Sequence, residues 1–354
     1  MTAAELASFS HVATYSAMAV YTIAFVAYAL DLAKRSGDAQ LRAARDGDAS
    51  AQESRGGSAP AVATSGAARS ASATASASAT GSGSGSGSTV VLERTAAPTD
   101  GPAPQRGSTF QRVGTAMVLL GLVVHLAAVV TRGVAAERVP WANMFEFALT
   151  GTAIIVGVFL VVRLFVDLGY LGAYVTGLTL VLLGIATVNY YVDVVPLPPA
   201  LQSAWLVIHV LVAIVATAFF ALAAGLSALQ LVQAKREQAQ LAGLRFMSTL
   251  PGAARLEDLA YRVALVGFVL WTFTLVAGAV WAERAWGRYW GWDTKEVWTF
   301  IIWVLYAGYI HARATRGWRG ARSSWLSIIG FAAVLFNFGV VNVFFKGLHA
   351  YSGL

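Results

Sequence analysis

The sequence predicts an all-α polytopic membrane protein with about eight transmembrane helices, and three observations support this prediction. Of the 354 residues, 57% are hydrophobic and only 12% are charged, which is about half the charged share of a typical soluble domain. The apolar residues occur in blocks close to the roughly 20 residues that a membrane-spanning helix needs. The chain contains no cysteine, which excludes disulfides, thiolate metal sites and thiol chemistry by this chain itself.

Eight apolar stretches are predicted to span the bilayer: 11–30, 113–131, 143–162, 168–190, 204–234, 260–282, 297–312 and 325–345. The first stretch has neither a basic segment before it nor a clear cleavage site. It therefore reads as a retained span rather than as a signal peptide. The fifth stretch is long enough to project beyond the bilayer.

The charge distribution predicts the orientation of these spans. If the N-terminus is outside, the inner segments carry 19 basic and 11 acidic residues, and the outer segments carry 6 basic and 7 acidic residues. Basic residues concentrate in cytoplasmic loops of membrane proteins, so both termini are expected outside. The same rule accounts for the net charge of +7 without a nucleic-acid partner.

The composition divides the chain into three parts. Residues 1–35 form the first transmembrane helix, and residues 111–354 form a seven-helix domain. Between them, residues 36–110 are rich in Ala, Ser, Gly and Thr and include GSGSGSGS at 81–88. Such a segment buries too little apolar surface to offset the entropy lost on ordering, so it is predicted to be a long disordered cytoplasmic linker.

The loop at 282–298, predicted to be outside, carries the most informative motif. It contains WGRYWGWDTKEVW, with four tryptophans and a tyrosine in thirteen residues. An aromatic belt at the membrane interface is one interpretation, and it accounts well for Trp271, Trp281 and Trp303. Tryptophans crowded into one glycine-containing loop instead favour a stacking surface for a flat aromatic ligand. The candidates for that surface are Trp286, Trp290 and Trp292.

The charged residues of the same loop have two interpretations each. Asp293 is placed to cap the seventh span, with Glu296 reaching back from the third helical position. Asp293 also remains a candidate for ligand binding. Arg288 and Lys295 are either solvated charges or partners for carboxylates on a ligand.

Two histidines are predicted to share the outer face with this loop. His209 lies near the outer end of the fifth span, and His349 lies just beyond the outer end of the eighth. A lone histidine at an interface is usually a polar anchor. Two imidazoles on opposite sides of a planar macrocycle are a haem-iron arrangement, so their coincidence with the tryptophan loop favours haem binding.

The other three histidines differ in predicted depth. His311 lies about 21 Å from the outer edge, in the cytoplasmic half of the seventh span. His125 lies in the outer half of the second span, so the two are too offset to hold one haem together. His125 is either a supporting ligand or a buried hydrogen-bonding residue. A haem ligand opposite His311 is expected to come from another chain, and His11 is expected at the surface.

Little else in the sequence suggests chemistry. Glu146, near the outer start of the third span, is a helix anchor together with Trp141 and Asn143, or else a functional carboxylate. No Ser-His-Asp arrangement, P-loop or dinucleotide fingerprint is evident. No catalytic residue is therefore assigned.

The segment WGRYWGWDTKEVW closely resembles the WWD motif of haem-handling proteins in cytochrome c biogenesis. Within that superfamily the chain is similar to the CcsA/ResC family of the System II pathway, called CcsB in actinobacteria. His209 in WLVIHV, His311, His349 in GLHAYSGL, and VPWANMFEF at 139–147 support the resemblance. It covers the first span and about 110–354, but not the linker.

This resemblance implies a holocytochrome c synthase, or haem lyase, that works with a ResB-type partner in the bacterial plasma membrane. The pair would carry haem b outward and attach it to the CxxCH motif of apocytochrome c, whose cysteines a separate thiol-reducing protein keeps reduced. His209 and His349 would ligate the haem iron beside the WWD loop. His311 would be an intramembrane ligand, with its trans histidine supplied by the partner.

Three alternatives remain open at this stage. A haem exporter or chaperone would share the motif but lack ligation activity. A proton or ion transporter would use His125 and His311 within the membrane, although it leaves the tryptophan loop unexplained. A purely structural subunit would have only an aromatic belt and would be colourless when purified.

Overall fold

The computed structural model describes residues 1–56, 108–194, 202–239, 245–345 and 347–349. Over these ranges the chain is helical and contains no strand, which confirms the predicted all-α class. The chain divides into two compact units, one formed by Met1–Arg42 with Gly107–Leu354 and the other by Ala43–Arg106. The first unit contains every candidate site residue.

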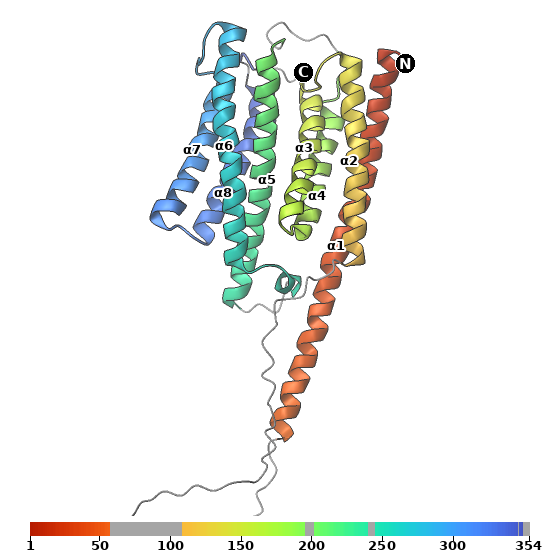
Figure 1. Cartoon of the computed structure of the whole chain (residues 1–354), viewed down its shortest axis with the longest axis vertical. Helices are drawn as coiled ribbons and strands as arrows, with labels where there is room; N and C mark the ends of the chain where they lie inside the picture. The colour runs from red at the N-terminus through yellow and green to blue at the C-terminus, as the bar shows by residue number, and fades with distance from the viewer. Residues whose placement is uncertain (57–107, 195–201, 240–244, 346, 350–354) are drawn as a thin grey trace, which may run out of the picture. The chain divides into compact units, whose positions relative to one another are not determined.

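Each predicted span corresponds to a helix in the structure (Figure 1). The long helices are α1 (Ala3–Gly56), α2 (Thr109–Ala136), α3 (Met144–Phe165), α4 (Gly172–Asn189), α5 (Ala204–Ala239), α6 (Ala253–Trp286), α7 (Thr294–Arg316) and α8 (Ala321–Phe336). The short elements are η1 (Gly169–Leu171), η3 (Arg245–Thr249), the π-helical turn η4 (Asn337–Val341) and α9 (Asn342–Phe344).

In the described part of the chain, seven helices are long and apolar enough to cross a membrane. Helix α7 has 23 residues, enough to cross, but charged residues at both of its ends lower its hydropathy. They include Lys295 and Glu296 in its first turn and Arg313 and Arg316 in its last. The protein is therefore a multi-pass membrane protein with about eight spanning helices. The predicted orientation of the termini stays a prediction.

The first helix extends further than the sequence analysis expected. It continues to Gly56, through residues 36–56 that were assigned to the linker. This stretch contains no proline, and its five Ala, three Arg and two Gln favour a helix. Residues 57–107 of the predicted linker lie outside the described residues, and its last residues already belong to the start of α2. The division into domains remains a prediction.

The centre of the bundle is formed by α5, which packs most extensively on α6 and also contacts α8 and α3. Phe220 of α5 stacks on Tyr306 of α7 with ring centroids 3.6 Å apart. Gly267 of α6 lies directly against Phe220, and a Cβ there would come within 2.8 Å of the ring. This close approach of α5 and α6 uses a small residue, as is common between membrane helices.

Consecutive helices run in opposite directions, so several connections gather at one end of the bundle (Figure 1). That end contains the 137–143 connection between α2 and α3, the 287–293 loop between α6 and α7, and the segment that follows α9. These three segments carry the predicted site residues outside the helices. The fold thus brings residues from distant parts of the sequence together at one end.

Candidate functional site

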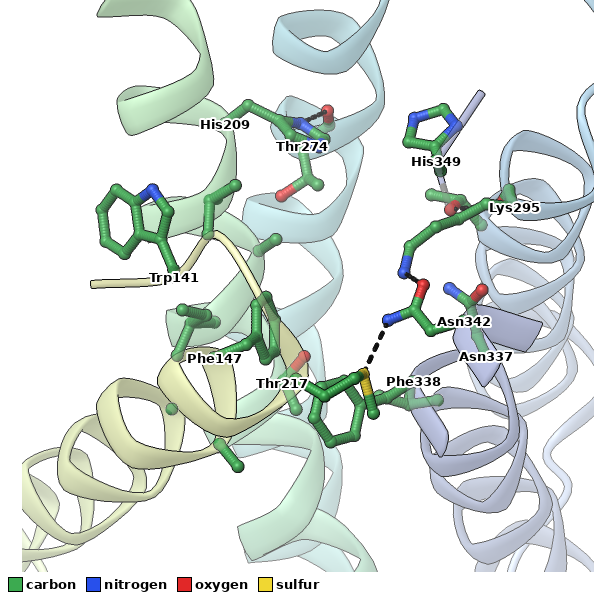
Figure 2. Close-up of a pocket in the computed structure, with 18 of the residues that line it drawn as sticks. Trp141, Phe147, His209, Thr217, Thr274, Lys295, Asn337, Phe338, Asn342 and His349 are labelled. Carbon is green, nitrogen blue, oxygen red and sulfur yellow. Dashed lines mark hydrogen bonds between the residues drawn. The ribbon is translucent and has the colours of Figure 1, made fainter. Parts of the chain in front are cut away.

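A cavity of about 190 Å³ lies among α3, α5, α6, α7 and the η4 turn (Figure 2). Its wall is mainly aliphatic and aromatic, and both His209 and His349 line it together with Lys295. A second, smaller cavity is also lined by these three residues and is closed by Tyr289 and Trp290 of the loop. An apolar cavity with a few polar groups is typical of a small-molecule site.

His209 is held in one orientation by helix α6. Its Nδ1 lies 2.9 Å from the backbone oxygen of Thr274. A carbonyl oxygen only accepts, so Nδ1 carries the proton and donates it to this bond. The Nε2 atom of the neutral ring then has a free lone pair, which is the form of histidine that binds metals.

Gly278, one turn after Thr274, provides the space for the His209 ring. A Cβ at position 278 would lie 2.7 Å from Cε1 and 2.9 Å from Nδ1 of His209. Any side chain at this position therefore has to displace the imidazole. The sequence analysis missed Gly278, because no local pattern indicates which glycine faces a histidine on another helix.

A Gly278→Ala substitution is expected to move the His209 ring and so to weaken binding of a ligand that contacts this imidazole in the cavity, by about tenfold or more. Second-shell changes of this kind typically cost 10–100-fold in metal affinity. Titration of the purified protein with its ligand, followed by absorbance, gives the affinity. Gly157→Ala in α3 is the matched control, since a Cβ there meets nothing within 4 Å. Equal affinities for the two variants would contradict the assignment of Gly278.

His349 is oriented by a carboxylate. Its Nδ1 lies 2.7 Å from Oδ2 of Asp293, and the backbone N–H of Leu348 donates to Oδ1 of the same residue. In the neutral form Nδ1–H donates to Asp293, which leaves Nε2 free, as for His209. The hydrogen bond from His349 is the largest cause of the lowered pKa of the Asp293 carboxyl. Asp293 is therefore charged at neutral pH.

Aromatic rings surround the two histidines. Trp281 is buried and lies nearly parallel to the His209 ring, at 6.0 Å and 13°. The same indole meets His349 edge-on at 5.5 Å, and Trp286 meets His349 edge-on at 4.7 Å. The belt interpretation is therefore wrong for Trp281, and also for Trp271, because both are buried and line the larger cavity.

The three loop tryptophans do not form one continuous surface. Trp286 packs inside against Trp281 and His349. Trp290 lines the smaller cavity and meets Trp292 edge-on at 6.0 Å. Trp292 is 74% exposed and has a positive φ of 58°, which is strained for a large residue. The predicted platform thus has an inner part next to the histidines and an outward-facing part.

Glu296 shapes the loop between α6 and α7. It accepts hydrogen bonds from Arg288 and from the backbone nitrogens of Gly291 and Asp293, at 2.8–3.1 Å. The capping box formed by Asp293 and Glu296 is present, as the sequence analysis expected. Arg288 also lies over the Trp286 ring, at 5.7 Å. Arg288 is thus committed within the loop, while Lys295 points into the cavity.

Glu146 is the centre of a buried ion network that the sequence analysis did not foresee. Both Glu146 and Arg132 are fully buried, and Nε of Arg132 lies 3.0 Å from Oε1. Arg138 approaches Oε2 at 2.6 Å, and the backbone nitrogen of Ala142 donates to the same oxygen. Asn143 caps α3, as expected. The network fastens the 137–143 connection, which contributes Trp141 to the cavity wall.

The remaining histidines lie away from the cavities. His311 is exposed on α7 and lines neither cavity. His125 is fully buried, with its Nδ1 3.3 Å from the Tyr21 hydroxyl, which supports the interpretation as a buried hydrogen-bonding residue. His11 is half-buried rather than fully at the surface, because its ring stacks on Tyr191 at 4.2 Å.

Comparison with known proteins points to a single family. The family described as cytochrome C assembly protein matches residues 114–349. A cytochrome c biogenesis protein CcsA of Guillardia theta is 34% identical over 269 residues, which cover 70% of this chain and 85% of the relative. The CcsA protein of Mesostigma viride is 29% identical over 70% of this chain and 88% of its own length. That of Synechococcus sp. (strain CC9902) is 38% identical over 44% of this chain and 58% of its own length.

Proposed function

Because the chain belongs to the cytochrome C assembly protein family, we propose that it holds haem between His209 and His349 and promotes attachment of that haem to apocytochrome c. The role in c-type cytochrome biogenesis, with haem handling, follows from the family itself. The proposal adds the site, the chemistry and the partner.

The proposal rests on one observation: the imidazoles of His209 and His349 are held in the same way. Each ring is fixed through Nδ1, one by a carbonyl oxygen and the other by a carboxylate. Each therefore keeps Nε2 free, and both rings line the same apolar cavity (Figure 2). Two such imidazoles suit the two axial positions of haem iron. The indoles of Trp281 and Trp286 offer aromatic surfaces to a planar macrocycle.

The chemistry is an addition of thiols to alkenes, for which haem b supplies two vinyl groups. In each thioether the cysteine sulfur bonds to the vinyl carbon next to the ring, and the thiol hydrogen goes to the terminal carbon. No electrons are gained or lost. The chain has no cysteine, so it has no thiol to compete for the vinyl groups. Its residues contribute by holding the reacting groups in place and by excluding water.

We further propose that a ResB-type partner completes the complex in the plasma membrane. His311 is exposed on α7, so its imidazole is open to a second chain, and a histidine of that chain would take the opposite side of the haem iron. The α6–α7 loop would lie outside, where apocytochrome c binds with its cysteines reduced by another protein. The excess of basic residues in the segments at the opposite end supports this orientation.

The test is formation of covalent haem by the purified complex of the full chain with its ResB-type partner. Haem and reduced apocytochrome c are added, and the denatured cytochrome is examined for bound haem. The wild-type complex is expected to yield covalent haem, and His209→Ala is expected to abolish most of it. An apocytochrome without the two cysteines serves as the negative control. A wild-type complex that binds haem and attaches none would contradict the synthase role and favour a haem exporter.

A further inference from the structure

The larger cavity contains a cation with no anionic partner. Lys295 is partly buried in the cavity wall, and its Nζ donates to the side-chain oxygen of Asn342, a neutral group (Figure 2). Among the described residues, no carboxylate lies within ion-pairing distance of it. The two nearest acids along the chain have other partners, since Glu296 accepts from Arg288 and from two loop nitrogens, and Asp293 is bonded to His349. A buried charge without a counter-charge is costly, so this position suits an anion that arrives with a ligand.

Two amides on the same wall extend this polar patch. Asn342 also donates from its Nδ2 to the sulfur of Met144, at 3.4 Å. Asn337, one π-helical turn earlier, lines the cavity beside them (Figure 2). Its side chain is 6% exposed, and its Oδ1 has no hydrogen-bond partner among the described residues. This oxygen only accepts, so it suits a hydrogen-bond donor and does not itself bind a carboxylate.

Lys295 is the only lysine or arginine among the described residues that line the cavity. The residues facing this patch include Phe147, Ile214 and Phe338, together with other apolar side chains from α3 and α5. A ligand with one charged edge and an apolar body therefore has a single favourable orientation, with its charge at Lys295. Haem has this character, since its two propionates lie on one edge and its vinyl groups lie elsewhere on the ring.

We infer that Lys295, positioned by its hydrogen bond to Asn342, binds a propionate carboxylate of haem and so sets which edge of the macrocycle points out of the cavity. This inference rests on the proposed function. The carboxylate accepts a hydrogen bond from the Lys295 ammonium. The vinyl edge is left free for the incoming thiols. Lys295 is thus a binding residue that fixes orientation, and His209 and His349 supply the bonds to iron.

The test compares haem with haem whose propionates are esterified as methyl esters, using the purified full chain with its partner. Absorbance titrations give the affinity for each. The wild type is expected to bind haem about 10- to 100-fold more tightly than the diester. Lys295→Met, which keeps an unbranched side chain but removes the charged group, is expected to lose most of that preference. Lys295→Arg is expected to retain it.

The outcomes separate this inference from the proposed function. A wild type that binds haem and the diester equally overturns the carboxylate site and leaves the two-histidine site standing. A preference that persists in Lys295→Met also overturns it. If the wild type binds neither haem nor the diester, that result would contradict both the proposed function and this inference. Because the wild-type comparison does not depend on any variant, the inference stays testable even if Lys295→Met fails to fold.

Discussion

Replacing Asp293 with asparagine is expected to weaken haem binding about 10- to 100-fold, the usual cost of changing the partner of a metal-ligating histidine. Asn remains a good cap for α7, so the helix start is preserved. The substitution removes the negative charge that keeps the Nδ1 proton on His349. An amide can also donate to Nδ1, which places the ring proton on Nε2 and blocks that atom as a ligand.

Absorbance titration of Asp293→Asn with haem measures this loss. Asp193→Asn is the matched control, because Asp193 is an exposed carboxylate at the same end of the bundle. Unchanged affinity in Asp293→Asn, or an equal loss in Asp193→Asn, would show that Asp293 does not act through His349.

The same contact predicts a pH dependence. The pKa of Asp293 lies below its ordinary value of 3.8, mainly because of the hydrogen bond from His349. Because the carboxyl pKa is lower in the folded protein than in the unfolded chain, the charged carboxylate stabilises the folded protein at pH values above the unfolded-state pKa. This stabilisation is lost as the pH falls through the lower pKa of the folded state. The contact between Asp293 and His349 is therefore expected to persist at neutral pH and to break only as the pH falls through the folded-state pKa of Asp293, which lies below 3.8.

Replacing Glu146 with glutamine is expected to destabilise the protein by about 3–5 kcal/mol, the usual cost of removing one partner of a buried ion pair. Arg132 has no exposed surface, so its charge would be left without a counter-ion in the interior. The loss is larger than that for a surface salt bridge, which contributes at most about 1 kcal/mol. Release of the 137–143 connection would also move Trp141 out of the cavity wall.

Thermal or denaturant unfolding of the purified protein in detergent measures the change in stability. Glu283→Gln is the matched control, since Glu283 lies at the same end of the bundle and makes no ion pair with a described residue. If Glu146→Gln unfolds under the same conditions as Glu283→Gln, the network does not stabilise the fold in the way described.

The helices were predictable because membrane spans are long apolar runs whose length the bilayer sets. The start of α7 was predictable as well, since a capping box depends on residues three apart. The continuation of α1 beyond residue 35 was not foreseen. There the sequence is polar and favours a helix by local propensity alone, and the analysis weighed only its inability to bury apolar surface.

The candidate site could be predicted only in part. His209 and His349 were identified because both were expected at the membrane face that carries the tryptophan loop. Two features depend on which faces of distant helices meet: the packing of His209 against Gly278 and the ion pair between Arg132 and Glu146. The one available signal of the buried network was a group of four charged residues within fifteen positions, Arg132, Glu137, Arg138 and Glu146.

The central claim, that His209 and His349 together hold haem, is tested most directly by the visible absorption spectrum of the purified complex. The full chain is co-expressed with its ResB-type partner in a His311→Ala background, which removes the proposed second site. The protein with both histidines is expected to show a Soret band with the α and β bands of bis-imidazole haem. His209→Ala and His349→Ala are each expected to lose the bis-imidazole bands and to regain them with added free imidazole, while His11→Ala is unchanged. Spectra that are the same with and without both histidines would contradict the account.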